Sequence, residues 1–171
     1  MKISIIISSY RETKAQLLET LFSIDTQKRI SFDDVEVIVV NDCGTPLYED
    51  KITTNFEHLQ NIKVTYLHNT KNGGPLSARE YGFKNSTGGY VQFIDAEDSL
   101  IYSFYLETVF SIIADTHPDL IIAPHIWETK INTEIKTMIQ GAGFLGFHGK
   151  VFKRELIEEI IPEGALKKER A

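Results

Sequence analysis

The amino-acid sequence predicts an α/β fold with a mostly parallel central sheet and helices on both of its faces. Short runs rich in Ile and Val, without alternating polar residues, are typical of strands buried on both faces. These runs alternate with segments whose apolar residues recur at helical spacing, and turn-forming residues separate the two. Strand–helix–strand units of this kind have right-handed crossovers and build a parallel sheet.

The clearest elements lie at the start of the chain. Residues 2–8 (KISIIIS) predict a central strand, and residues 13–27 predict a helix that begins at a Thr-x-x-Gln capping pattern. Residues 35–40 predict a second buried strand, which ends in the turn formers of residues 41–46. A helix over residues 48–58 has weaker support from the pattern.

The alternation continues through the next third of the chain. Pro75 favours a helix start, because its missing N–H is not needed in the first turn, and Pro118 favours a stop before it. The elements expected are strands at residues 62–68, 90–94 and 120–123 and helices at residues 75–85 and 100–116.

The last part of the chain is less regular. A strand pair is expected within residues 126–139, a glycine-rich loop at residues 141–149 and a short amphipathic helix at residues 153–161. No linker is long enough to separate a second domain, so residues 126–171 are expected to pack on the domain formed by residues 1–125.

Composition excludes several classes of protein. The 171 residues are 42% hydrophobic and 25% charged, as in an ordinary globular domain. The formal net charge is −6 and no basic run is present, so neither a nucleic acid nor an anionic membrane is an expected partner. We expect no transmembrane segment, since no apolar stretch approaches ~18 residues. With no secretion leader and a lone thiol at Cys43, a cytoplasmic location is expected.

Polar side chains follow three of the predicted strands. In open α/β sheets, ligands bind beyond the carboxyl ends of the parallel strands, so these residues are the candidates for a site. They are Ser8, Ser9, Tyr10, Arg11 and Glu12 after the first strand, Asn41 and Asp42 after the second, and Asp95, Glu97 and Asp98 after the fourth.

The common phosphate-binding motifs do not explain this set. The turn after the first strand lacks the glycines of a dinucleotide site, and no P-loop pattern is present. A Gly-x-Gly-x-x-Gly run at residues 141–146 has no regular helix after it, which favours a mobile loop over a phosphate cradle.

The acidic run Asp95-Ala96-Glu97-Asp98 has two interpretations. Its oxygens could hold Mg²⁺ or Mn²⁺, with phosphate oxygens in the remaining coordination positions, and the ion would let an acidic protein bind a diphosphate. The same carboxylates could instead favour the start of the following helix. Taken by itself, the run favours helix capping.

Four segments in order resemble the nucleotide-sugar half of family 2 glycosyltransferases, whose GT-A fold is Rossmann-like. They are SIIISSY, VEVIVVNDCG, NGGPLSAREYG and YVQFIDAEDSL, and together they span about residues 2–100. The last resembles the family's strand ending in an Asp-x-Asp metal motif. A later segment, HGKVFKREL, is similar to one that follows the central region in many members.

The resemblance implies a role for each site residue. Ser9 and Tyr10 would form the turn that contacts the nucleobase, and Asp42 would accept a hydrogen bond from the base. Asn72 and Arg79 would border the nucleotide, and Asp95 would support the acidic loop. Glu97 would address the ribose or the metal, and Asp98 would be the direct metal ligand. Structural alternatives stay open: a packed aromatic for Tyr10, a turn-capping carboxylate for Asp42 and a solvated side chain for Arg79.

Three departures from the family pattern affect the prediction. Glu97 stands where the family usually has Asp, and Glu80 stands where Asn is common after the arginine. No residue matches the general base that inverting members use, and the chain is expected to end before the region that carries this base in the family. For His148, Lys150 and Arg154 we favour solvent-facing roles over closure on a diphosphate.

The function expected from the resemblance is transfer of a sugar from a nucleoside diphosphate sugar, UDP-linked, to an unknown acceptor (glycan, lipid-linked or protein). Mn²⁺ or Mg²⁺ would assist an inverting displacement, and residues 126–171 would form the acceptor side or a lid. A non-catalytic or truncated module for nucleotide-sugar binding or assembly is the first alternative. A sugar nucleotidyltransferase is the second, although the glycine- and arginine-rich phosphate loop expected of it is absent after the first strand.

Overall fold

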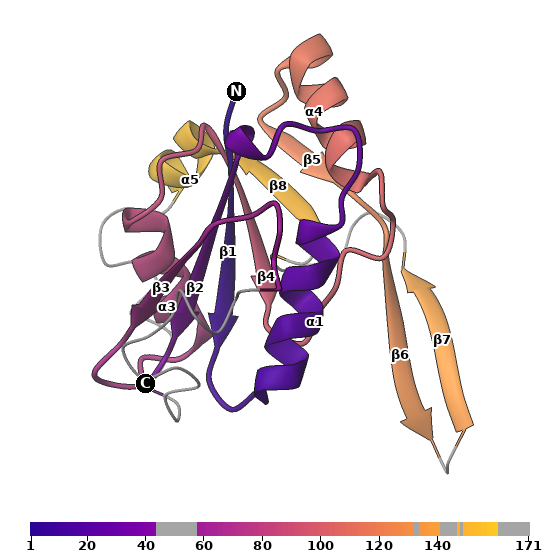
Figure 1. The fold of residues 1–171 in the computed structure, drawn as a ribbon. Coiled ribbons are helices and arrows are strands. Elements are labelled where there is room, and N and C mark those ends of the chain that lie inside the picture. Colours follow the sequence, from indigo (N-terminus) through magenta and orange to yellow (C-terminus); the bar gives the residue numbers. More distant parts are fainter. Residues whose placement is uncertain (44–57, 132–133, 141–146, 148, 161–171) are drawn as a thin grey trace.

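Figure 1 shows the computed structural model of the chain, which describes residues 1–43, 58–131, 134–140, 147 and 149–160. Within these residues, a six-stranded sheet has the order β3-β2-β1-β4-β8-β5, and β6 pairs with β7 in a separate two-stranded sheet. The strands are β1 (Ile3–Ser9), β2 (Val35–Asn41), β3 (Val64–His68), β4 (Tyr90–Asp95), β5 (Leu120–Ile122), β6 (His125–Ile131), β7 (Glu134–Gln140) and β8 (Lys150–Lys153). The helices are α1 (Lys14–Asp25), the 3₁₀ turn η1 (Phe32–Asp34), α3 (Pro75–Lys84), α4 (Tyr105–Thr116) and α5 (Arg154–Ile160).

Parallel pairing at the centre of the sheet confirms the predicted fold class. β1 lies between β2 and β4 and runs parallel to both, and β2 also pairs with β3 in parallel. Every residue of β1 is buried, as expected for a strand covered on both faces.

Helices cover both faces of the sheet (Figure 1). Ile5 and its neighbours two positions away on β1 share one core with α1 and α4, whereas Ile6 shares the other core with α3 and α5. Gly82 lets α3 approach the sheet closely, because a Cβ at this position would overlap the side chain of Ile6. The alternation of β1 side chains between the two cores follows from the two-residue period of a strand.

The helix after β1 begins as its sequence predicts. The Thr13 side chain accepts a hydrogen bond from the backbone N–H of Gln16, and the Gln16 side chain accepts one from the backbone N–H of Thr13. This reciprocal capping box satisfies N–H groups that have no partner inside the helix. Leu17, Leu21 and Ile24 then turn their apolar side chains into the core.

Two elements start later than predicted, because backbone N–H groups at the start of each predicted range donate to side chains that are distant in the sequence. The backbone N–H of Ile62 donates to the Asp25 carboxylate at 2.9 Å, and β3 begins only at Val64. The expected helix from residue 100 begins at Tyr105, and the backbone N–H of Leu100 donates instead to the Ser23 hydroxyl at 2.9 Å.

The C-terminal part contains a strand that the sequence pattern missed. Residues 150–153 form β8, so the helix predicted from residue 153 is α5, from Arg154 to Ile160. β8 runs antiparallel to β4 and β5 and separates them. Four residues with lysine at both ends carry too little hydrophobic pattern to predict a central strand. The strand pair predicted within residues 126–139 is confirmed as β6 and β7.

Other predicted features lie outside the described residues. They are the helix expected at residues 48–58, apart from residue 58, and most of the glycine-rich loop at residues 141–149.

Candidate functional site

The polar ends of β1, β2 and β4 meet at one edge of the sheet. Ser8 stands beside Asp95, and Ser9 stands beside Asn41, in the parallel register. The Ser8 hydroxyl donates to the Asp95 carboxylate at 2.7 Å, and the backbone N–H of Asp42 donates to the Ser9 carbonyl at 2.8 Å. The sheet therefore brings the candidate residues of all three strand ends together.

Asp42 holds the loop that leads into α3. Its carboxylate accepts hydrogen bonds from the Asn69 side chain at 2.9 Å and from the backbone N–H of Gly74 at 2.6 Å. The N–H of Gly73 also donates, at 3.1 and 3.2 Å from the two carboxylate oxygens. Asp42 is only 3% exposed, which matches the turn-capping alternative, and its contact with a nucleobase stays a prediction.

The turn after β1 places Tyr10 at the surface. Tyr10 is 37% exposed, and the guanidinium of Arg11 lies 4.9 Å from the centre of its ring. The Glu12 carboxylate shapes this turn, since it accepts the N–H of Tyr10 at 2.6 Å and the hydroxyl of Ser9 at 3.1 Å. An exposed ring beside buried Ser9 is a suitable surface for stacking on a planar ligand.

Arg79 is not the solvated side chain of the structural alternative. It is buried on α3, and its Nη2 donates to Oδ1 of Asp95 at 2.6 Å. The ring of Phe147 lies 5.3 Å from the guanidinium carbon. Asn72, in contrast, is exposed in the loop before α3, where its side chain accepts the N–H of Gly74 at 3.0 Å.

Glu97 and Asp98 are exposed in the turn that follows β4. The N–H of Asp98 donates to the carbonyl of Asp95 at 2.9 Å, which closes the turn. Within the described part of the chain, no group of three or more His, Cys, Asp or Glu side chains is placed to hold a metal ion. Two exposed carboxylates nonetheless fit Mg²⁺ or Mn²⁺, because such ions often take one or two carboxylates together with water and substrate phosphates.

Sequence reasoning missed two contributors to this edge, Asn69 and Phe147. Asn69 follows β3 directly and was a foreseeable candidate, because residues after a parallel strand lie at this edge. Phe147 lies in the glycine-rich stretch near the C-terminus, and nothing in that pattern indicates its contact with Arg79.

Arg154 lies away from this edge, and the solvent-facing role expected for it is wrong. Its guanidinium donates to the Gly88 carbonyl and to the Ser86 hydroxyl, both at 2.7 Å, close to the start of β4. His148 is outside the described residues, and Lys150 begins β8.

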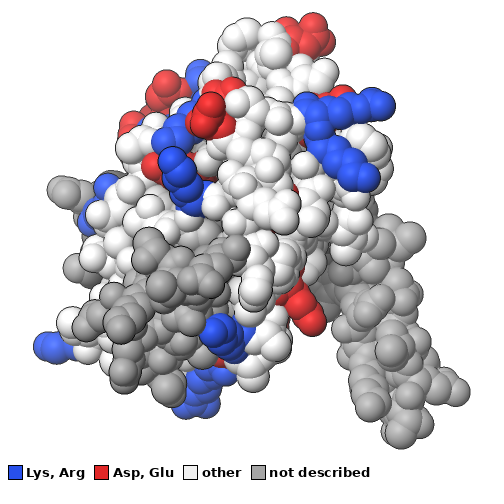
Figure 2. Space-filling view, viewed as in Figure 1, with Lys and Arg blue, Asp and Glu red and all other residues white. Residues whose placement is uncertain are grey.

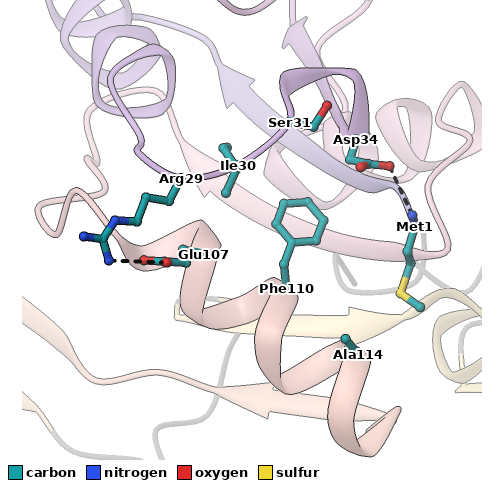
Figure 3. A pocket seen from close by; sticks show the side chains of 8 residues that line it. All are labelled: Met1, Arg29, Ile30, Ser31, Asp34, Glu107, Phe110 and Ala114. Carbon is teal, nitrogen blue, oxygen red and sulfur yellow. Dashed lines mark hydrogen bonds and ion pairs between the residues drawn. The ribbon is translucent and has the colours of Figure 1, made fainter.

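A pocket of about 300 Å³ opens at the opposite edge of the sheet, near the starts of β1 and β2 (Figure 3). The N-terminal ammonium of Met1 pairs with Asp34 at 3.1 Å, and Arg29 pairs with Glu107 of α4 at 3.7 Å. Its charged groups are thus already paired within the chain. The predicted site residues are not among those that line it.

Figure 2 shows Lys and Arg side chains in several separate groups, with Asp and Glu side chains near some of them, on the face in view. None of the helices that the structure describes has the length and apolarity needed to cross a membrane.

Comparison with known sequences assigns most of the chain to one family. The model of "Glycosyl transferase family 2" matches residues 4–166. The poly(ribitol-phosphate) beta-N-acetylglucosaminyltransferase TarS of Staphylococcus aureus is 32% identical over 124 residues, which cover 71% of this chain and 20% of TarS. An uncharacterized glycosyltransferase of Nostoc sp. is 27% identical over 180 residues, which cover 95% of this chain and 54% of the relative. The chain thus spans between about a fifth and half of the length of these relatives.

Solved structures show the same fold. The crystal structure of TarS 1–349 in complex with UDP-GlcNAc has a TM-score of 0.68 and 21% sequence identity, covering 94% of this chain and 47% of that one. The mannosyltransferase PcManGT of Pyrobaculum calidifontis, in complex with GDP-Man and Mn²⁺, has a TM-score of 0.69 and 20% identity, covering 93% and 46%. The central sheet is therefore that of the GT-A glycosyltransferases. With the family model matching from residue 4 to residue 166, the chain belongs to glycosyl transferase family 2.

Proposed function

We propose that the chain is the donor-binding part of a metal-dependent glycosyltransferase. The proposed donor is a UDP-linked sugar. The single observation that carries the proposal is the edge where β1, β2 and β4 end. There an exposed aromatic ring and exposed carboxylates share one edge of the sheet, in a chain that belongs to glycosyl transferase family 2. The TarS structure is a complex with UDP-GlcNAc and the PcManGT structure is a complex with GDP-Man and Mn²⁺, and the UDP assignment is the proposal for this chain.

Each residue has a defined task in the proposed complex. Tyr10 stacks on the nucleobase, and Asp42 orders the neighbouring loop and accepts a hydrogen bond from the base. Glu97 and Asp98 hold Mn²⁺ or Mg²⁺, and Asp98 is the direct ligand. A divalent ion at this position supplies the positive charge that a diphosphate leaving group needs.

The chain's own contribution to the transfer is positioning. A donor held with its anomeric carbon open to the acceptor reacts without the entropic cost of an unassisted encounter. We propose an inverting displacement at that carbon, and we assign the general base to no residue. The acceptor is a glycan, a lipid-linked sugar or a protein.

Calorimetric titration of UDP into the full chain, with and without Mn²⁺, tests the proposal. We expect Mn²⁺ to strengthen UDP binding, and Asp98→Asn to weaken the Mn²⁺-dependent binding by at least about tenfold. Asp115→Asn is the matched control, because Asp115 is an exposed carboxylate on α4, outside the candidate site. Equal and negligible heats under both conditions would reject donor binding at this edge.

Release of free UDP from UDP-sugars separates catalysis from binding alone. UDP release that requires Mn²⁺ and is lost in Asp98→Asn supports the transferase. Tight Mn²⁺-dependent binding without release, in the presence of candidate acceptors, supports the binding module instead.

A further inference from the structure

We infer that Arg79 is a positioning residue for the acidic turn, acting through Asp95, rather than a ligand of the nucleotide. The inference rests on the proposed function and deepens it, because it names the group that holds the metal-binding carboxylates in place. It differs from the role that the family resemblance implies for Arg79, which is to border the nucleotide itself.

The pairing of Arg79 with Asp95 is short and partly buried. Nη2 of Arg79 lies 2.6 Å from Oδ1 of Asp95, and the exposed fractions of the two side chains are 10% and 31%. The Ser8 hydroxyl donates to the same Oδ1 at 2.7 Å. One carboxylate oxygen therefore links the end of β1, the end of β4 and the helix α3. Charge-assisted hydrogen bonds of this length are stronger than neutral ones.

Backbone hydrogen bonds connect Asp95 to the acidic turn, so the Arg79–Asp95 pair also affects the position of that turn. Its backbone carbonyl accepts the N–H of Asp98 at 2.9 Å, and the N–H of Ala96 donates to the Ser8 carbonyl at 3.0 Å. Ala96 is fully buried, whereas Glu97 and Asp98 are exposed on the same turn. A shift of Asp95 would therefore move the two exposed carboxylates. Groups that orient a metal ligand in this way typically change metal affinity or activity about 10–100-fold when removed.

The surroundings of Arg79 disfavour direct contact with a ligand. The ring of Phe147 lies 5.3 Å from the guanidinium carbon, and this ring packs edge-on against Phe93 with their centres 5.1 Å apart. Nε of Arg79 is also buried, so this nitrogen is not open to solvent. A side chain enclosed by an aromatic ring and paired with a carboxylate is suited to holding that carboxylate.

A double-mutant cycle on Arg79 and Asp95 tests the inference in the full chain. The variants are Arg79→Gln, Asp95→Asn and the double variant, and the measurement is UDP affinity at a fixed Mn²⁺ concentration. We expect each single change to weaken binding about 10–100-fold, and the double variant to bind no more weakly than the weaker single variant. Losses that multiply in the double variant would show that Arg79 contacts the nucleotide independently, which overturns the inference.

Two further measurements separate positioning from a general loss of structure. The Mn²⁺ concentration that gives half-maximal UDP binding is expected to rise in Arg79→Gln, while the affinity for uridine, which has no phosphates, stays within about twofold of the wild type. Arg79→Lys keeps the charge and is expected to recover part of the loss, but only where Asp95 is intact. A loss of uridine affinity equal to the loss of UDP affinity overturns the inference.

If Arg79→Gln does not fold, Ser8→Ala tests whether hydrogen bonds to Asp95 support UDP binding. This change removes the second donor to the same oxygen and leaves the Arg79–Asp95 pair intact. We expect UDP binding with Mn²⁺ to weaken about fivefold in the wild-type background and not at all in Asp95→Asn. An equal loss in both backgrounds overturns the inference. A wild-type chain that binds no UDP would reject the proposed function, and the inference with it, whereas UDP binding with independent losses rejects the inference alone.

Discussion

Replacement of Asp42 by alanine removes the acceptor that holds the loop between β3 and α3. The carboxylate accepts the N–H of Gly74 at 2.6 Å, the Asn69 amide at 2.9 Å and the N–H of Gly73 at 3.1 and 3.2 Å. Hydrogen bonds to a charged group contribute about 1.5–3 kcal/mol each, and we discount the weaker Gly73 bonds because Gly73 is exposed. Release of the buried carboxylate from its own desolvation offsets part of the loss.

We therefore expect Asp42→Ala to lower the free energy of unfolding by about 2–4 kcal/mol. For a chain of this size the midpoint temperature would fall by roughly 5–15 °C. Asp42→Asn keeps one acceptor oxygen, so its loss should be about half as large. Urea denaturation followed by circular dichroism, together with a thermal scan, measures both quantities.

Asp115→Ala is the matched control for this experiment, since Asp115 is an exposed carboxylate on α4. We expect the control to stay within about 0.5 kcal/mol of the wild type. If Asp42→Ala were as stable as the control, the hydrogen bonds at this loop would contribute nothing net. The turn-capping interpretation of Asp42 would then be refuted.

Three further changes test the rest of the fold. Burial alone would raise the pKa of the Glu36 carboxyl, but hydrogen bonds from Ser4 and Thr87 outweigh it and hold the pKa below 4.5. The wild type should therefore have a higher free energy of unfolding than Glu36→Gln, with the full difference present above pH 4.5 and a smaller one as the pH falls through the folded-state pKa. Urea midpoints that differ equally at all pH values would contradict this. Thr13→Ala should cost about 1 kcal/mol through loss of the capping box, and an unchanged urea midpoint would argue against the cap. Gly82→Ala should lower the thermal midpoint, because overpacking costs about 1–3 kcal/mol whereas the better helix propensity of alanine stabilises by only about 1 kcal/mol. A raised midpoint would show that the sheet shifts to accommodate the added methyl group.

The sequence by itself determined the elements that depend on neighbouring residues. The apolar runs of β1 and β2 predict buried strands because each run alone has the pattern of a strand covered on both faces. The Thr13 capping box is a contact between residues three positions apart, so it can be predicted from spacing. Parallel strands also place their carboxyl ends at one edge of the sheet, which is why the polar residues after β1, β2 and β4 were predicted to meet.

The tertiary structure decided the features that depend on residues distant in the chain. β8 enters the sheet between β4 and β5, and a four-residue strand has too few residues to show its partner through periodicity. Whether Arg79 is solvated or paired depends on Asp95, which lies on another element, and on Phe147 from the C-terminal part. The partners of Asp42 come likewise from the loop after β3. A local pattern shows which groups are polar, whereas packing determines which partner satisfies each of them.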